Sequence, residues 1–278
     1  MVQSIKVVTI NILFDLRDWP RRRDLLVQGL AAEQADLIGI QEVKLPENNA
    51  AWLAEQLGFP YVQLVPYGPN DVPSLPNYGS AILSRHPFQQ EAILDLQSQG
   101  RFAQRVQVEI AGQPLIFCNG HYFWYPGPAP GRQAQIARLL AWLAELPPEL
   151  PQVVVGDFNG EPQTPAIAQM RQAFTSAYAA HHGCEPDYTC PTPLARRNWR
   201  KVVRQVWLDL FYNRTLRSWR GTLDYIFVSP TLSVRDCRLI LNQPAPGRRR
   251  LYPSDHFGLA AELVWSGGDR PGDSRQIS

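Results

Sequence analysis

The chain is organised around the stretch Val153-Val154-Val155-Gly156-Asp157-Phe158-Asn159. Three consecutive β-branched apolar residues are typical of a strand that is buried on both faces. Gly156 ends this strand, and Asp157 and Asn159 follow directly. A buried strand that ends in a carboxylate and an amide holds two polar groups on a rigid support, which suits a catalytic pair. An Asx-turn that closes the strand would explain the same two residues without a function.

Strand and helix patterns continue on both sides of this stretch. Apolar or alternating segments predict further strands at residues 5–12, 36–40, 61–65, 79–83, 93–96, 102–110, 115–118, 223–228, 235–241 and 258–265. Helices are predicted after Pro20, from Asn48 or Asn49 to Leu57, over 136–146, and over 165–174. The two halves follow comparable orders of elements. Two sheets packed face to face, with helices outside, would bury the wholly apolar strands on both sides.

The composition fits a folded protein with a large core. A chain of 278 residues, 45% of them hydrophobic, can form one large domain or two small ones. The net charge of +2 does not by itself indicate a nucleic-acid binder, and four scattered cysteines do not predict a disulfide framework. We find no signal peptide before the first strand and no apolar run near the ~20 residues of a membrane span. We therefore expect a soluble, cytoplasmic protein, and the sequence does not indicate its oligomeric state.

Polar residues stand at or near the ends of the predicted strands. Besides Asp157 and Asn159 they are Asn11, Gln41-Glu42, Asn119-Gly120-His121, Asp224 and Ser254-Asp255-His256. Asp224 is expected inside an otherwise apolar strand, where an acid is costly unless it is paired or hydrogen-bonded. His256 is the candidate partner for this acid.

Together these stretches resemble the endonuclease/exonuclease/phosphatase superfamily. Its motifs appear in order as Thr9-Ile10-Asn11, Gln41-Glu42-Val43, Asn77 to Ser84, Asn119-Gly120-His121, Gly156 to Asn159, Leu223 to Ser229, and Ser254-Asp255-His256. Each motif is weak alone, but seven in the right order are specific. The resemblance implies a four-layer α/β/β/α sandwich, with two face-packed mixed sheets and outer helices, that hydrolyses phosphoesters with a divalent metal. We expect one such domain over residues 1–265 and a disordered tail over 266–278.

The resemblance also implies a metal site. Glu42 would be the main ligand, Asn11 would ligate the ion or steer a bound water, and Asp255 would ligate it or orient a neighbour. Mg²⁺ takes one or two carboxylates plus waters and phosphate oxygens, which suits so sparse a set, and Mn²⁺ is a possible substitute. The family often has an acid where this chain has Leu13, which leaves open whether one or two metals bind. Without the resemblance, Glu42 would be taken for a surface charge at a strand end.

The remaining polar residues would carry the chemistry. His121 would hydrogen-bond a phosphate oxygen, and Asp224 would fix the tautomer of His256 and stabilise its cation. Two schemes remain open. Either His256 takes the proton of the attacking water, or Asp157 does so while His256 stabilises charge at phosphorus and Asn159 holds phosphate or water.

A basic segment over residues 196–220 suggests the substrate. Arg196, Arg197, Arg200 and Trp199 are the predicted substrate-binding residues, since arginine binds phosphate and indoles stack on bases. A helix over 196–211 with a solvated basic face would explain the same pattern. We therefore expect a nuclease or phosphodiesterase that acts on nucleic acid. The alternatives are hydrolysis of a phospholipid headgroup or small phosphoester, and an inactive scaffold that binds nucleic acid or protein.

Overall fold

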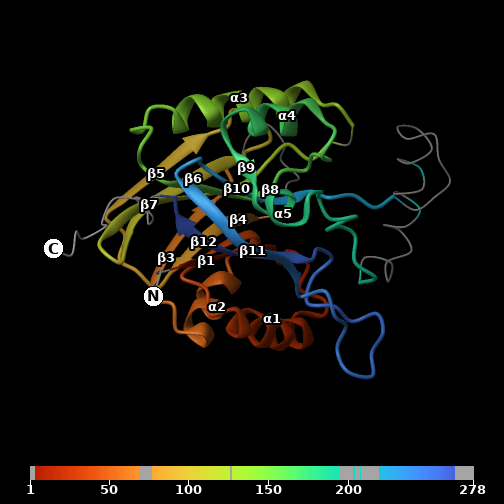
Figure 1. The fold of residues 1–278 in the computed structure, drawn as a ribbon. Coiled ribbons are helices and arrows are strands. Elements are labelled where there is room, and N and C mark those ends of the chain that lie inside the picture. The colour runs from red at the N-terminus through yellow and green to blue at the C-terminus, as the bar shows by residue number, and fades with distance from the viewer. Residues whose placement is uncertain are drawn as a thin grey trace.

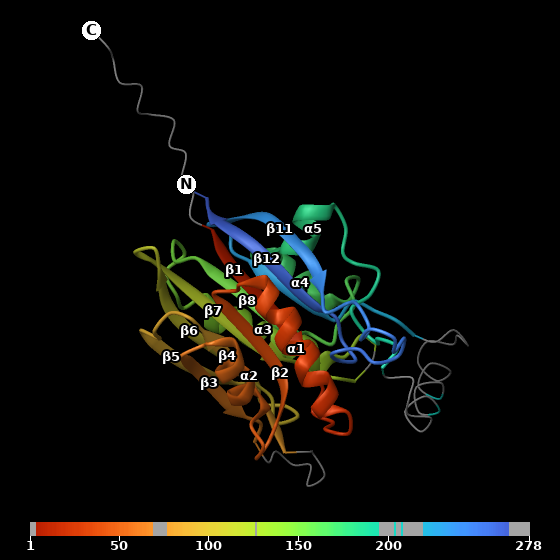
Figure 2. The same cartoon turned by 90° about the horizontal axis from the view of Figure 1, so that it is seen from below.

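Two six-stranded mixed sheets pack face to face between outer helices, with α1 and α2 on one side and α3 and α4 on the other (Figures 1 and 2). This arrangement confirms the four-layer α/β/β/α sandwich implied by the sequence. The computed structural model describes residues 4–68, 77–125, 127–194, 203, 207 and 219–266.

The first sheet has the strand order β11-β12-β1-β2-β4-β3. Its strands are β1 (Ile5–Asn11), β2 (Leu37–Lys44), β3 (Tyr61–Pro66), β4 (Tyr78–Ser84), β11 (Leu232–Ile240) and β12 (Gly258–Trp265). The helices on its outer face are α1 (Trp19–Glu33) and α2 (Asn49–Leu57). Helix α1 connects the parallel strands β1 and β2, so these three elements form a βαβ unit.

The second sheet has the strand order β5-β6-β7-β8-β10-β9. Its strands are β5 (Gln90–Asp95), β6 (Phe102–Ile110), β7 (Gln113–His121), β8 (Gln152–Asp157), β9 (Thr175–Ser176) and β10 (Asp224–Val228). The helices of this half are α3 (Pro130–Leu143), α4 (Pro165–Ala173) and the short α5 (Ala177–His182). Helix α3 connects the parallel strands β7 and β8 and completes a second βαβ unit.

Strand β8 is buried on both faces, as its sequence predicts. Val153 and Val155 point into the apolar layer between the sheets, whereas Val154 packs in the cluster beneath α3 and α4. All three side chains have no exposed surface. Because successive side chains of a strand point to opposite faces, a run of three valines can only be buried in this way inside a layered fold.

The strand register gathers the polar residues at one end of the sandwich. Parallel pairing of β7 with β8 places His121 beside Asp157, and antiparallel pairing of β8 with β10 places Asp224 opposite Asp157. In the first sheet Asn11 pairs with Gln41. Asp224 is the first residue of β10 and does not lie inside the strand as the sequence suggested, so its carboxylate reaches the strand end.

Gly156 makes the close approach of β7 and β8 possible. Its φ is +144°, and a Cβ atom there would lie 2.0 Å from the carbonyl oxygen of Gly120. We expect Gly156→Ala to lower the free energy of unfolding by about 3 kcal/mol or more, because backbone strain and a backbone clash add. Gly112→Ala is the control, since φ there is +76° and a Cβ would meet nothing within 4 Å. It should cost only about 1–2 kcal/mol. Urea denaturation measures both, and equal costs would contradict the close approach.

Some predicted elements differ from the structure. Helix α3 begins at Pro130, earlier than the sequence indicated, and the short β9 and α5 were not predicted. The helix expected over 196–211 lies outside the described residues, apart from Val203 and Trp207, whose side chains are more than half exposed. The expected tail beyond Ser266 also lies outside them, and its disorder remains a prediction. No helix formed by the described residues is long and apolar enough to cross a membrane.

Candidate active site

Asp157 lies at the centre of the polar cluster. Its Oδ2 accepts a hydrogen bond from Asn11 Nδ2 at 3.1 Å, and its Oδ1 accepts one from the backbone N–H of Asn159 at 2.9 Å. The same Oδ2 lies 3.5 Å from His121 Nε2 and 3.9 Å from His256 Nε2. Asn11 comes from the first sheet, so the site spans the two sheets. All five residues are among those that the sequence marked.

Burial sets the charge of the groups around Asp157. It raises the pKa of Asp157 to about 7, and the nearby Asp224 carboxylate also raises this pKa, whereas His256 and two hydrogen bonds lower it. The pKa of His121 lies well below its usual value because of burial first, and then because of the charges of Arg101 and His256. His121 is therefore neutral at pH 7, and one of its ring nitrogens can donate a hydrogen bond.

His256 and Asp224 form the expected carboxylate–imidazole pair. His256 Nδ1 lies 2.9 Å from Asp224 Oδ2, which also accepts a hydrogen bond from Thr189 Oγ1 at 2.5 Å. Burial opposes the charge of His256, but Cys190 and Asp224 outweigh it, so the pKa of His256 lies well above its usual value. The pairing points the other ring nitrogen, Nε2, toward Asp157.

Glu42 reaches the site through an irregularity of β2. The pairing of β2 with β4 shifts between Gln41 and Val43, and Glu42 adopts a positive φ of +61°. A bulge of this kind redirects a side chain at a strand end. Oε2 of Glu42 accepts a hydrogen bond from the backbone N–H of Phe14 at 3.1 Å. Burial, and then the nearby Asp255 carboxylate, raise the pKa of Glu42.

Ser254 connects the segment that carries Asp255 and His256 to β1. Its hydroxyl donates a hydrogen bond to the carbonyl oxygen of Asn11 at 2.6 Å. Oδ1 of Asn11 accepts a hydrogen bond from the N–H of Leu13 at 3.1 Å, which orients the amide. The three predicted metal-binding residues, Asn11, Glu42 and Asp255, therefore lie in one neighbourhood.

Two groups of side chains at this end could hold a cation. In the described part of the chain, one set of three offers ligand atoms within 4.8 Å of one another, namely Asp157, Asp224 and His256. In that set, however, Asp224 and His256 already bind each other. Glu42 and Asp255 are two carboxylates whose repulsion a cation would relieve, and Asn11 adds an amide oxygen. This oxygen-rich set suits a hard divalent ion better, since such ions prefer oxygen ligands.

Arg101 is a site residue that the sequence did not reveal. Its side chain is 2% exposed, and its guanidinium carbon lies 5.0 Å and 5.3 Å from the ring centroids of Tyr67 and Tyr78. None of the described residues accepts a hydrogen bond from its Nε or Nη1. Its charge lowers the pKa of His121, so it lies close to the site. No pattern around Gly100-Arg101 distinguished it from an ordinary residue before a strand.

Arg22 was also not predicted from the sequence, although it connects two segments that carry site residues. Its buried guanidinium donates hydrogen bonds to the carbonyl oxygens of Ile12 at 2.8 Å, Pro253 at 3.0 Å, Leu13 at 3.2 Å and Asp15 at 2.7 Å. These carbonyls belong to the segments that follow Asn11 and precede Asp255. A signal was available, since Arg22 lies four residues before Leu26 and eight before Leu30, the other buried residues of α1.

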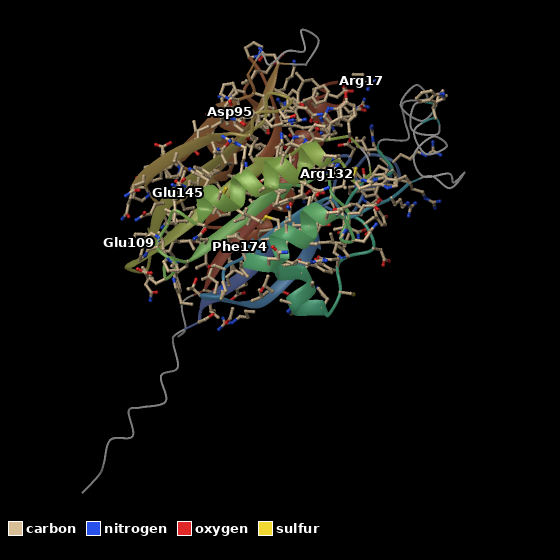
Figure 3. All side chains as sticks on the ribbon, turned by 90° about the horizontal axis from the view of Figure 1, so that it is seen from above. Arg17, Asp95, Glu109, Arg132, Glu145 and Phe174 are labelled. Carbon is tan, nitrogen blue, oxygen red and sulfur yellow. The ribbon has the colours of Figure 1, made fainter. Side chains whose placement is uncertain are left out.

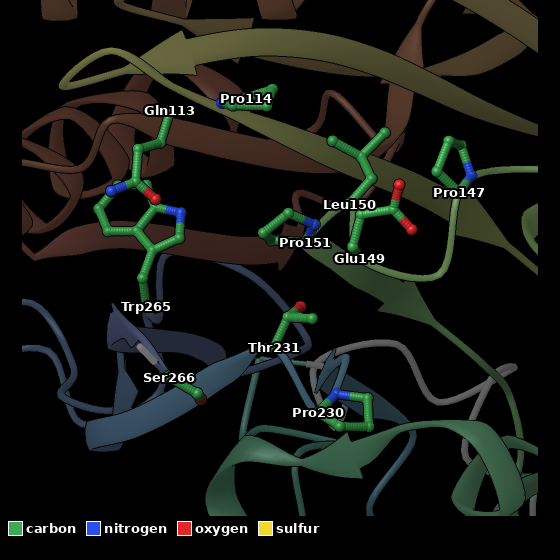
Figure 4. Close-up of a pocket in the computed structure, with 10 residues that line it drawn as sticks. All are labelled: Gln113, Pro114, Pro147, Glu149, Leu150, Pro151, Pro230, Thr231, Trp265 and Ser266. Carbon is green, nitrogen blue, oxygen red and sulfur yellow. The ribbon is translucent and has the colours of Figure 1, made fainter. Parts of the chain in front are cut away.

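The polar cluster and a surface pocket of the structure lie at opposite ends of β7 and β8. Arg132, at the start of α3, lies toward the same end as Arg17, while Glu109 and Glu145 lie toward the other (Figure 3). A pocket of about 630 Å³ is lined by Gln113, Pro151, Trp265 and neighbouring residues, near the starts of β7 and β8 (Figure 4). The polar cluster lies at the opposite ends of these strands.

The predicted substrate-binding residues Arg196, Arg197, Trp199 and Arg200 lie outside the described residues.

The chain belongs to the Endonuclease/Exonuclease/phosphatase family, whose model matches residues 8–256. Enzymes of this family depend on divalent metal ions.

Two curated proteins and one solved structure are similar to this chain. Nocturnin of Mus musculus is 25% identical over 268 residues, which cover 89% of this chain and 59% of Nocturnin. The 2′,5′-phosphodiesterase 12 of Bos taurus is 23% identical over 201 residues, or 66% of this chain and 31% of the relative. D. rerio TDP2 complexed with a single-strand DNA product has a TM-score of 0.73 at 18% identity, covering 94% of this chain and 99% of that one. This chain thus spans three fifths or less of the two curated relatives, and the structural match shows the fold alone.

Proposed function

We propose that this protein is a divalent-metal-dependent phosphodiesterase of nuclease type that acts on nucleic acid. The observation that carries the proposal is the convergence of both sheets on Asp157, which lies within 4 Å of Asn11, His121 and His256. A buried carboxylate beside two imidazoles, and near a second pair of carboxylates, can activate water and neutralise phosphate charge. The same arrangement argues against an inactive scaffold, which would not need these side chains.

The side chains divide the work of hydrolysis. His121 and Asn159 bind oxygens of the phosphate, and Arg101 is a further cation for that group. Asp157 accepts the proton of the attacking water, and Asn11 orients its carboxylate. His256, held by Asp224, stabilises the charge that develops at phosphorus. This division favours the second of the two schemes that the sequence left open.

Glu42, Asp255 and Asn11 would hold the metal ion, for which we propose Mg²⁺, with Mn²⁺ as a substitute. When bound, the ion neutralises charge on the phosphate and lowers the pKa of water. The protein supplies oxygen ligands from β1, from the end of β2 and from the segment before β12. A metal titration that follows thermal unfolding tests this site without turnover, because an ion that binds the folded state raises its stability.

Three observations support nucleic acid as the substrate. One relative is named a 2′,5′-phosphodiesterase, one solved neighbour holds a single-strand DNA product, and the sequence has a basic, tryptophan-containing segment at 196–220. A substrate panel tests the proposal: single- and double-stranded DNA, RNA, a phosphoinositide and a generic diester, each with Mg²⁺, Mn²⁺ or chelator. We expect metal-dependent cleavage of at least one nucleic acid. Hydrolysis of the phosphoinositide alone would favour a headgroup phosphatase instead.

The basic segment itself yields a prediction. Neutralising Arg196, Arg197 and Arg200 together should make the plot of log binding constant against log salt concentration less steep. If each arginine contacts one phosphate, the magnitude of the slope should fall by about 2–3. Anisotropy of a labelled oligonucleotide at several salt concentrations measures this slope. Neutralising Arg235 and Arg238 on the edge strand β11 is the control. An unchanged slope in the triple variant would assign its arginines to a solvated surface.

A further inference from the structure

Three consecutive aromatic residues, Phe123, Trp124 and Tyr125, leave the site end of β7 and form what we call the aromatic loop. The Tyr125 side chain is 51% exposed. Its ring centroid lies 4.5 Å from that of Trp124 and 5.3 Å from that of Phe123. A cluster of large aromatic rings with an exposed member, on a loop beside a candidate active site, indicates a binding surface.

The aromatic loop is held in place by Arg132, whose side chain is 1% exposed. Its guanidinium donates hydrogen bonds to the carbonyl oxygens of Phe123 at 3.1 Å and Gly127 at 2.9 Å, and also to that of Tyr125. The N–H of Phe123 donates to Gln135 Oε1 at 2.8 Å. Because these bonds fix the backbone before any ligand arrives, binding would not have to order the loop.

Hydrogen bonds connect residues 122–124 to Asn159, which we assign to phosphate binding, and to Gln99, which lies near Arg101 in the chain. Asn159 Nδ2 donates a hydrogen bond to the carbonyl oxygen of Tyr122 at 3.0 Å. The N–H of Trp124 donates to Gln99 Oε1 at 3.1 Å, two residues before Arg101. Three steps along the chain span at most about 11 Å, so the Cα atoms of Tyr122 and Tyr125 are no farther apart than this. The surface thus offers phosphate contacts beside an exposed aromatic ring, the two features that a nucleotide requires.

We infer that the aromatic loop is a stacking site for a nucleobase next to the scissile phosphate of a single-stranded nucleic acid. This inference rests on the proposed function and adds a base-binding subsite to it. A base in a single strand has an open π-face that can stack on Tyr125, and such stacking is tolerant of sequence. The loop therefore contributes affinity for any base. The side chains that bind the phosphate determine which bond is cut.

The test compares strands with and without bases. Fluorescence anisotropy, in chelator to prevent turnover, would measure the binding of labelled oligothymidylate and of an abasic strand of equal length. Tyr125→Ala should weaken binding of oligothymidylate about tenfold and leave the abasic strand unchanged, since stacking of one base is worth a factor of this size. Tyr125→Phe should retain wild-type binding. Tyr61→Ala is the control, because Tyr61 is 37% exposed on β3 and belongs to neither loop nor site.

Several results would overturn the inference. One is equal weakening on both strands, which would show that Tyr125 acts through the backbone or the fold. Another is wild-type binding to phosphatidylcholine vesicles that Tyr125→Ala abolishes, which would assign the ring to a lipid interface. If the wild type cleaves nucleic acid but Tyr125→Ala binds oligothymidylate normally, only this inference fails. If the wild type neither cleaves nucleic acid nor binds either strand, the proposed function fails with it.

Discussion

Replacement of Glu42 by alanine is expected to reduce kcat/KM for a phosphodiester by about 1,000-fold or more. The expectation follows from the place of this carboxylate, which lies near Asp255 and Asn11 on a bulge of β2 where φ is positive. A bound divalent ion provides several kcal/mol of charge stabilisation in such reactions, and each 1.36 kcal/mol is about tenfold in rate. Losing the main ligand should remove most of this stabilisation.

The control for Glu42→Ala is Glu33→Ala, which removes another half-buried carboxylate. Glu33 pairs with Arg238 and lies outside the site, so turnover should remain at the wild-type level. Thermal unfolding with increasing Mg²⁺ gives a second measurement. The wild type and Glu33→Ala should show a rise in Tm with the ion, and Glu42→Ala should show little or none. An Mg²⁺-dependent rate near that of the wild type in Glu42→Ala would place the metal elsewhere, for example at Asp157, Asp224 and His256.

Local patterns marked most residues of the candidate site because these residues stand at the ends of strands with strong signals. The valines before Asp157 and the apolar residues before Asn11 mark buried strands, and such strands can be recognised from a few residues. The sequence could not reveal which strands pair. That Asp224 stands directly opposite Asp157 depends on the register of β8 with β10, which brings together residues 67 positions apart in the chain. Long-range pairings of this kind are fixed by the packing of the whole sheet.

The residues that sequence reasoning missed are buried arginines. Arg22, Arg101 and Arg132 are each 2% exposed or less, whereas arginine is usually exposed. Arg22 and Arg132 are buried because their donors meet backbone carbonyls of loops, and no sequence pattern shows where those carbonyls will be. The conformation of Glu42 was hidden for a similar reason, because a positive φ at a residue other than glycine is imposed by its surroundings.

Arg22 and Arg132 show that the two halves are built alike. Each arginine follows a proline by two residues in the first turn of the helix that joins two parallel strands, α1 in one sheet and α3 in the other. Each precedes a buried apolar residue by four positions, namely Leu26 and Ile136. Each binds carbonyls of the loop that enters its helix. The comparable halves noticed in the sequence thus correspond to two βαβ units that open toward one shared site.

Replacement of His256 by alanine is expected to reduce kcat by at least ~100-fold with a small change in KM, the scale for a group that moves a proton or stabilises charge. Asp224→Asn should lower kcat by a similar factor, because Asp224 Oδ2 lies 2.9 Å from His256 Nδ1 and fixes the ring. If Asp224 acts through His256, the double variant should be no slower than His256→Ala. Residues that act as a unit give such non-additive effects.

The chain offers a matched control for this pair. His86 Nε2 lies 3.0 Å from Asp36 Oδ1, so it forms a second histidine–aspartate pair outside the site, and His86→Ala should leave kcat unchanged. Near-ultraviolet circular dichroism would establish that every variant keeps its tertiary packing. If the losses from His256→Ala and Asp224→Asn multiplied in the double variant, Asp224 would have a role of its own. Such a role would have to use Oδ1, which has no hydrogen-bond partner within the described residues. If His256→Ala kept the wild-type rate at saturating Mg²⁺, the charge at phosphorus would have to be stabilised by other groups, such as His121 and Arg101.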